Sequence, residues 1–77
     1  MNTLSILTNL KVGQLATVNK LNTSGDVRRR LQDIGLIEGT PVECVLKSPG
    51  KYPIAYQIRG AIIALRSEDS NTVVVNL

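Results

Sequence analysis

The spacing of apolar residues changes its period once along this chain, within the stretch Ser24–Val42. There, Val27, Leu31 and Ile34 recur at intervals of four and three residues, which places them on one narrow stripe of a helix. We therefore predict a short helix over Ser24–Ile34, whereas most of the remaining chain shows the two-residue period of β-strands. This helix must pack onto a small sheet structure or be inserted into it.

Both ends of the predicted helix carry recognisable signals. Ser24 is placed to act as an N-cap through its hydroxyl, and Asp26 puts negative charge near the positive end of the helix dipole. Gly35 can adopt the left-handed conformation that ends a helix. In that geometry Leu36 folds back toward Leu31, which predicts a Schellman-type stop.

Alternating apolar and polar positions predict short strands on both sides of the helix. Ala16 and Val18 share one face of a strand before it, and Val42, Cys44 and Leu46 share one face of the strand after it. The predicted strand segments are Leu4–Leu10 (a short edge strand), Gln14–Lys20, Pro41–Lys47, Ile54–Ile58, Ala61–Leu65 and Thr72–Leu77.

The connections between these strands carry turn signals. Arg59-Gly60 is a two-residue hairpin turn, Ser67–Ser70 forms one capped helical turn, and Ser48–Pro53 is the longest exposed loop. About five to six short strands with one inserted helix predict a mostly β fold in a single domain over residues 1–77. A small closed barrel is the expected form, because closure removes the exposed edges that a flat sheet would leave.

A short pattern occurs twice, once before each of two predicted strands. Leu10-x-x-Gly13-Gln14-x-Ala16-x-Val18 is matched by Leu36-x-x-Gly39-Thr40-x-Val42-x-Cys44. Two strands that need the same entry turn, with glycine supplying a positive φ, explain this similarity. Two copies are too few to indicate a repeat architecture.

Composition favours a small cytoplasmic protein. The chain has 77 residues, of which 43% are hydrophobic, and its single cysteine excludes an intramolecular disulfide. The start MNTLSILTNL lacks the basic and apolar regions of a secretory signal. The longest apolar run, 61–65, is too short to span a bilayer, so we expect no direct membrane insertion.

The side chains that usually carry chemistry are sparse. The chain has no histidine, and the lone Cys44 shares the parity of Val42, which predicts a buried thiol rather than a zinc ligand. Glu68 and Asp69 could offer a loose oxygen site, although acids in a first helical turn usually serve the helix dipole. No Walker loop, Rossmann fingerprint or nucleophile elbow is present. We therefore predict no enzyme activity, no cofactor and no resident metal.

The run Arg28, Arg29 and Arg30 is the sharpest charge feature in a chain of net charge +3. Asp26 precedes Arg30 by four positions, and Arg29 precedes Asp33 by four, so both pairs can form ion pairs between successive turns of this helix. One interpretation is a solvated, self-neutralised face. The other is a docking surface for an acidic protein patch or for phosphates. The basic residues are less dense than on a typical nucleic-acid-binding helix, and two tyrosines give few stacking platforms, so no nucleic-acid partner is expected.

The order and spacing of several motifs resemble the FeoA family, ferrous iron transport protein A. The first motif is Arg30-Leu31-x-x-Ile34-Gly35-Leu36-x-x-Gly39-x-x-Val42. The second half of the chain carries Ser48-Pro49, Pro53-Ile54-Ala55-Tyr56, Arg59-Gly60, Ala64-Leu65-Arg66, Glu68 and Val73-x-Val75. The chain departs from the family pattern at Val12 and Glu38, where proline is frequent, at Lys51-Tyr52-Pro53, where Gly-Asp-Pro is frequent, and at Ser70, where alanine is frequent.

The resemblance implies an SH3-like β-barrel with a helical insertion and a cytosolic accessory role beside FeoB, the membrane ferrous-iron transporter. The expected contact is between proteins, and the exposed residues expected to make it are Arg28, Arg29, Lys51 and Tyr52. The family is also grouped with transition-metal binders, which implies a divalent metal that this sequence itself does not support. The alternative is a stand-alone metal-responsive or DNA-associated regulatory domain, related to the C-terminal barrels of iron-dependent repressors.

Overall fold

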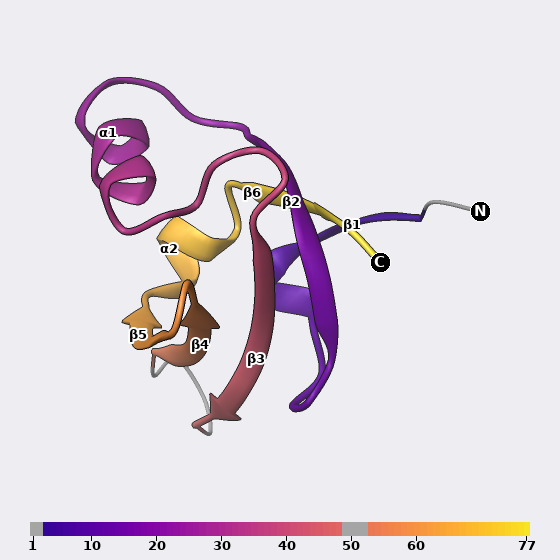
Figure 1. Ribbon diagram of the computed structural model, residues 1–77. Helices are drawn as coiled ribbons and strands as arrows, with labels where there is room; N and C mark the ends of the chain where they lie inside the picture. The colour runs from indigo at the N-terminus through magenta and orange to yellow at the C-terminus, as the bar shows by residue number, and fades with distance from the viewer. Residues whose placement is uncertain (1–2, 49–52) are drawn as a thin grey trace.

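A six-stranded antiparallel sheet in the order β1-β6-β2-β3-β4-β5 dominates the computed structural model, which describes residues 3–48 and 53–77 (Figure 1). Helix α1 lies beyond one end of the β2–β3 pair, above α2 and the β4–β5 hairpin, and both termini lie on the opposite side (Figure 1). The strands are β1 (Leu4–Ile6), β2 (Leu15–Leu21), β3 (Pro41–Lys47), β4 (Ile54–Ile58), β5 (Ala61–Leu65) and β6 (Val73–Asn76). The helical elements are η1 (Leu7–Asn9, a 3-10 turn), α1 (Gly25–Asp33) and α2 (Ser67–Ser70).

The predicted elements are confirmed with small changes in their bounds. The segment Leu4–Leu10 divides into an edge strand and a 3-10 turn, because Leu10 donates its amide to the carbonyl of Leu7 at 3.1 Å. The hairpin turn lies at Arg59-Gly60, where both residues have positive φ (51° and 83°), as a type I′ turn requires. The predicted exposed loop Ser48–Pro53 lies largely outside the described residues.

The core lies inside the curled sheet and under α1. All three valines of β6 are buried because this strand lies between β1 and β2. Helix α1 contributes one fully buried side chain, Leu31, and its neighbours Val27 and Ile34 are half-buried against the same cluster. The predicted apolar stripe is therefore confirmed.

The prediction that Leu46 shares a buried face with Val42 and Cys44 is wrong. Val42 and Cys44 are buried, but Leu46 is 60% exposed. The register between β3 and β4 shifts between Cys44 and Leu46, which is typical of a β-bulge. The extra residue moves every later side chain of β3 to the other face.

The hydrogen-bonded ladder does not close in the described part of the chain. Its two end strands are β1, which pairs with β6, and β5, which pairs with β4. The predicted closed barrel is thus a curled sheet with an open seam. Instead of another strand, helices α1 and α2 lie beside the β5 end of the sheet.

The two similar sequence patterns form the same turn. Gln14 donates to Lys11 at 2.9 Å in the first, and Thr40 donates to Ile37 at 3.0 Å in the second. The turn glycines have φ of +88° (Gly13) and +89° (Gly39). Each turn is also hydrogen-bonded to the strand that follows the other turn: the Gly13 turn to β3 and the Gly39 turn to β2. The bonds are Gly13 N to Cys44 O, 2.7 Å; Gly39 N to Val18 O, 2.8 Å; Cys44 N to Gln14 O, 3.2 Å; and Val18 N to Thr40 O, 2.9 Å.

The end of α1 follows the predicted Schellman motif. Leu36 donates to Leu31 and Gly35 donates to Gln32, both at 3.0 Å, and Gly35 has φ of +106°. A Cβ at Gly35 would lie 2.6 Å from Cδ of Arg59, so the arginine stem covers this glycine. The end of α1 therefore packs on the β4–β5 hairpin turn.

The start of α1 differs from its prediction. Ser24 occupies the N-cap position with extended backbone angles, but its side chain makes no capping hydrogen bond. Gly25 enters the helix with φ of +67°, outside the helical range, and this entry leaves the Ser24 hydroxyl without an amide of the first turn. Asp26 lies in the first turn, as predicted.

Candidate functional site

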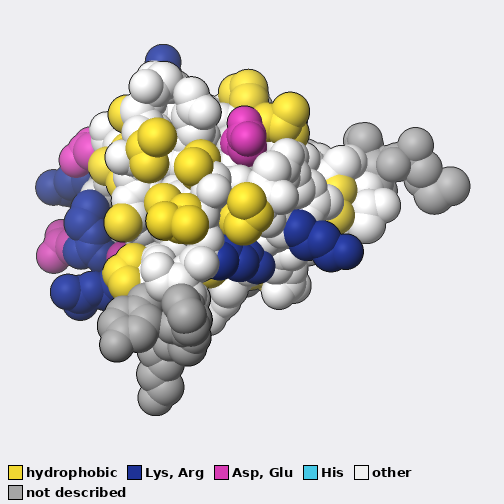
Figure 2. All heavy atoms as spheres, turned by 90° about the horizontal axis from the view of Figure 1, so that it is seen from below, with side chains coloured by type: hydrophobic (Ala, Val, Ile, Leu, Met, Phe, Trp, Pro, Cys, Tyr) yellow, Lys and Arg dark blue, Asp and Glu magenta, His cyan; other side chains and the backbone are white. Residues whose placement is uncertain are grey.

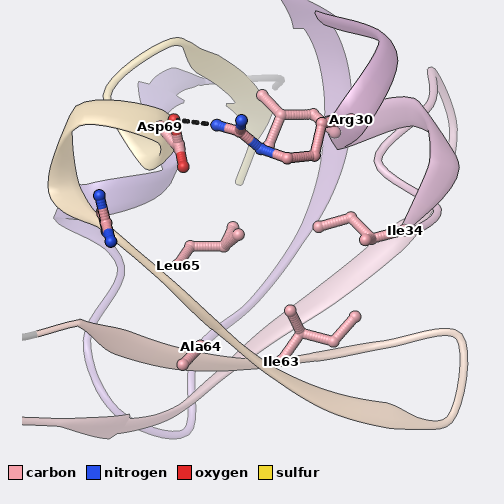
Figure 3. Close-up of a pocket in the computed structure, with 8 residues that line it drawn as sticks. Arg30, Ile34, Ile63, Ala64, Leu65 and Asp69 are labelled. Atoms are coloured by element: carbon pink, nitrogen blue, oxygen red, sulfur yellow. Dashed lines mark hydrogen bonds and ion pairs between the residues drawn. The ribbon is translucent and has the colours of Figure 1, made fainter. Parts of the chain in front are cut away.

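A groove of about 410 Å³ separates α1 from β5 and α2 (Figure 3). We call it the α1–β5 groove. Its volume is within the range of roughly 300–1,000 Å³ that is usual for ligand sites. Its lining residues are Arg30, Leu31 and Ile34 from α1, Ile63, Ala64 and Leu65 from β5, and Arg66 and Asp69 from the α2 segment.

The floor and walls of the α1–β5 groove are apolar. Leu31 and Leu65 are buried, and Ile34 and Ile63 are half-buried against the core. Figure 3 shows the side chains of Ile34, Ile63 and Leu65 directed into the space between helix and strand. The helical stripe and the strand alternation thus direct two sets of aliphatic side chains toward each other from separate elements.

An ion pair crosses the rim of the groove. Nη2 of Arg30 lies 3.1 Å from Oδ1 of Asp69, and this bond joins α1 to α2 (Figure 3). The predicted pair of Arg30 with Asp26 does not form, and neither does the pair of Arg29 with Asp33. In the described chain, the Arg30–Asp69 bridge is the one ion pair. Because Arg30 borders the apolar stripe, its side chain reaches across the groove rather than along the helix.

A cluster of hydroxyl groups, buried at Ser70 and Tyr56 and half-buried at Thr8, lies behind α2. The Ser70 hydroxyl, on a side chain with no solvent exposure, is 2.9 Å from that of Thr8, which donates to Asn71 at 2.7 Å. The Tyr56 hydroxyl, also buried, donates to the carbonyl of Leu7 at 3.3 Å. Burial raises the pKa of Tyr56 to about 12, and the nearby Ser70 hydroxyl offsets part of this increase. This cluster fixes α2, which carries Asp69 and Arg66 beside the groove.

The predicted partner-binding residues do not lie together in this groove. Arg28 is directed to the other side of α1, where it donates to the carbonyl of Leu21 at 3.2 Å. Arg29 is exposed on the same helix. Lys51 and Tyr52 lie outside the described residues. Of the three consecutive arginines of α1, the one that borders the groove is Arg30.

A second apolar surface covers the outer face of the sheet. Figure 2 shows apolar side chains gathered on the side where β4, β5 and the end of β3 lie, with Lys and Arg at its margins. Leu15, Leu46 and Ile62 are each more than half exposed. Register places Leu15, Glu43, Gln57 and Ile62 in one row across four strands. Polar residues therefore interrupt the apolar surface on this face.

Comparison with known proteins decides the family. A family model of the FeoA domain matches residues 6–77. The chain belongs to the FeoA family. The resemblance inferred from the sequence motifs is thereby confirmed.

Solved FeoA proteins share the fold over nearly the whole chain. FeoA from Chlorobium tepidum is 29% identical, with a TM-score of 0.86 over 95% of this chain and 70% of that one. FeoA from Stenotrophomonas maltophilia, complexed with zinc, is 29% identical, with a TM-score of 0.82 over 92% of this chain and 88% of that one. The latter is described as a prokaryotic SH3 domain protein and is connected with ferrous iron transport. The FeoA-family fold of this chain is therefore SH3-like, as predicted.

The same fold occurs in metal-dependent repressors. IdeR of T. acidophilum is 17% identical, with a TM-score of 0.83 over 97% of this chain and 34% of that one. This similarity shows a shared fold alone. No curated protein matches this chain closely enough to count as a relative. Among the described residues, neither helix has the length and apolar character needed to cross a membrane.

The donor set of this FeoA chain does not fit a resident transition metal. In residues 3–48 and 53–77, no three His, Cys, Asp or Glu side chains are grouped for coordination. The free thiol of Cys44 is buried, and burial raises its pKa, which disfavours the thiolate that binds metals. Asp69 is engaged by Arg30.

Sequence reasoning missed the groove but contained part of its signal. The sequence indicates that Leu31 and Ile34 share one face of a helix. It also indicates that Ile63 and Leu65 share one face of a strand. What no local pattern indicates is that these two apolar faces meet side by side.

Proposed function

We propose that this FeoA-family chain is a cytoplasmic accessory protein of ferrous iron uptake that binds the cytosolic part of a FeoB-type transporter. The observation that supports this proposal is the α1–β5 groove, with an apolar floor and a rim that carries arginines. Folds of the SH3 type act through grooves and loops on a rigid scaffold. Ferrous iron is the cargo of the transporter in this proposal, and the chain itself need not bind it.

The composition of the groove favours a protein segment over a reacting substrate. Its titratable side chains are Arg30, Arg66 and Asp69. Neither arginine offers a general base at neutral pH, and the Asp69 carboxylate is engaged by Arg30. Aliphatic side chains of a partner can replace water on Leu31, Leu65 and their neighbours, which removes apolar surface from solvent. Arg29 adds positive charge on the same helix, and Lys51 and Tyr52 remain predicted members of the contact surface.

The proposal is tested by titrating the isotope-labelled protein with the isolated cytosolic domain of the cognate FeoB-type transporter. Amide shifts concentrated in α1, β5 and α2 are expected. Two neighbouring isoleucines of β5 give matched variants. Ile63→Thr changes a groove wall, whereas Ile62→Thr changes a side chain that is 67% exposed on the outer face. Weakened binding by the first and unchanged binding by the second supports the groove. Equal effects, or no binding by the unmodified protein, count against it.

A cellular readout tests the role of the charges. Arg29→Glu reverses one exposed charge on α1, and FeoB-dependent ferrous iron uptake should fall while the fold is retained. Intact uptake in a folded Arg29→Glu protein would remove Arg29 from the proposed surface.

A further inference from the structure

The β5 edge is an unpaired strand edge that carries no protective residue of its own, and helix α1 lies across the groove from it. β5 has the sequence AIIAL and pairs with β4 alone among the described strands. Natural edge strands are commonly protected by proline, charged side chains or bulges, because unpaired backbone groups otherwise accept another strand. None of these devices is present between Ala61 and Leu65.

The hairpin geometry identifies which backbone groups face outward. In a two-residue turn, the flanking pair Ile58 and Ala61 is hydrogen-bonded, and such pairs alternate along an antiparallel ladder. Ala61, Ile63 and Leu65 therefore direct their N–H and C=O groups toward β4. Ile62 and Ala64 direct theirs toward the open edge.

The open edge and the apolar groove lie at the same place. Ala64 lines the α1–β5 groove together with Ile63 and Leu65, whose side chains point into it (Figure 3). A strand added to β5 would meet unpaired backbone groups of β5. Every second side chain of that strand would face Leu31 and Ile34 of α1. Main-chain hydrogen bonds to β5 would then supply affinity, and the apolar side chains of the α1–β5 groove would select the partner's sequence.

We propose that the α1–β5 groove binds an extended segment of the partner protein, which adds to β5 as a further strand of the sheet. This inference rests on the proposed function, because it specifies the form and chemistry of the partner segment. The segment has aliphatic residues at alternate positions and an acidic residue beside them.

Charge complementarity accounts for the acidic residue. Arg30 and Arg66 both line the groove, whereas Asp69 is the single acid among its lining residues. Asp69 is already paired with Arg30, which leaves a net positive rim. A carboxylate in the added strand can form a charge-assisted bond with this rim, and a basic segment would be repelled.

Amide hydrogen exchange provides the direct test. The amides of Ile62 and Ala64 should exchange rapidly in the free protein and slow by about tenfold or more with saturating cytosolic transporter domain. Absence of a complex would overturn both this inference and the proposed function. A complex in which the groove residues shift while these two amides exchange as before would overturn this inference and leave the proposed function in place.

Two variants at Ala64 separate backbone pairing from side-chain contact. Ala64→Pro removes the outward N–H, and proline is tolerated where the N–H of an edge strand faces solvent. Ala64→Thr changes the side chain and keeps the N–H. Both variants change the side chain of a groove residue, and only the proline variant removes the outward N–H, so we expect the proline variant to weaken binding about tenfold more than the threonine variant. Equal weakening by the two variants would overturn backbone pairing.

The exchange measurement keeps the inference testable if the proline variant does not fold. A third outcome concerns the occupant of the edge. Concentration-dependent protection of Ile62 and Ala64 without the transporter domain would show that a second copy of this chain occupies β5. That result would overturn the proposed partner.

Discussion

The two walls of the α1–β5 groove are held in different ways. β5 is joined to β4 by a ladder of five residue pairs that begins at a tight turn. Helix α1 has nine residues but buries one side chain completely, Leu31, and its three arginines extend from it in different directions. One wall is therefore fixed by backbone hydrogen bonding and the other by a few side-chain contacts.

This difference indicates where the site can adapt. A strand in a ladder moves little without breaking several hydrogen bonds, whereas a helix held by a few side-chain contacts can shift its position at smaller cost. We expect the groove to open and close by movement of α1 against a stationary β5. The following predictions test this contrast.

The largest effect is expected from Leu31→Ala, which removes the main anchor of α1. Loss of a fully buried leucine should lower the free energy of unfolding by about 2–5 kcal/mol. Urea denaturation followed by circular dichroism measures this change. Leu15→Ala, at a leucine that is 65% exposed, is the matched control and should cost less than about 0.5 kcal/mol. Equal losses would show that α1 is not anchored through Leu31.

Gly35→Ala should have the next largest effect, because it strains the end of α1. Alanine at a φ of +106° should cost about 1–3 kcal/mol, and its Cβ would also contact the Arg59 stem. Gly13→Ala is a matched control with φ of +88° and open space around the added Cβ, so it should cost less. The excess should vanish in the double variant Gly35→Ala with Arg59→Ala, measured by a thermodynamic cycle.

Tyr56 gives a pH-dependent test of the hydroxyl cluster that fixes α2 beside the groove. The pKa is about 12 in the folded protein and about 10 in an unfolded chain, so the folded state holds its proton more tightly. Stability from this group is complete below pH 10 and is lost as the pH rises toward 12. Tyr56→Phe should show a flatter decline of unfolding free energy over this window. Parallel curves for the two proteins would contradict the assignment.

The smallest effect is expected at the ion pair on the rim. Asp69→Asn should change the free energy of unfolding by less than about 1 kcal/mol, because Arg30 is 59% exposed and the pair is screened by solvent. Raising the salt concentration should reduce the difference between the variant and the parent protein. A loss that is larger and independent of salt would mean that this pair, rather than Leu31, holds α1 in place.

Local sequence signals predicted most of the fold. The Schellman stop at Gly35, the hairpin at Arg59-Gly60 and the strand parity around Cys44 each depend on residues within a few positions of one another. The exposure of Leu46 was not predictable in this way. It results from a bulge, which is a property of the pairing between β3 and β4.

The site depends more on tertiary structure than the fold does. Arg30 was assigned a partner four residues away, yet its partner is Asp69, 39 positions along the chain. Local spacing identifies which charges can pair within a helix, but the competing partner comes from the packing of α1 against α2. The groove itself exists because an apolar helix stripe and an unpaired strand lie side by side. The sequence predicts each of these elements separately but does not predict that they are neighbours.

The reciprocal turns at Gly13 and Gly39 have a consequence for the inserted helix. They clamp the two ends of the β2–β3 ladder, and the clamp at Gly39 lies where the chain leaves Val18 and returns at Thr40, so both ends of the intervening segment are fixed to one base. A segment closed in this way is an exchangeable module, because the entropy of closing it changes slowly with its length. We therefore expect the sheet to accept helical segments of other lengths between these two points, provided that they keep the core contacts of Leu31 and Leu36.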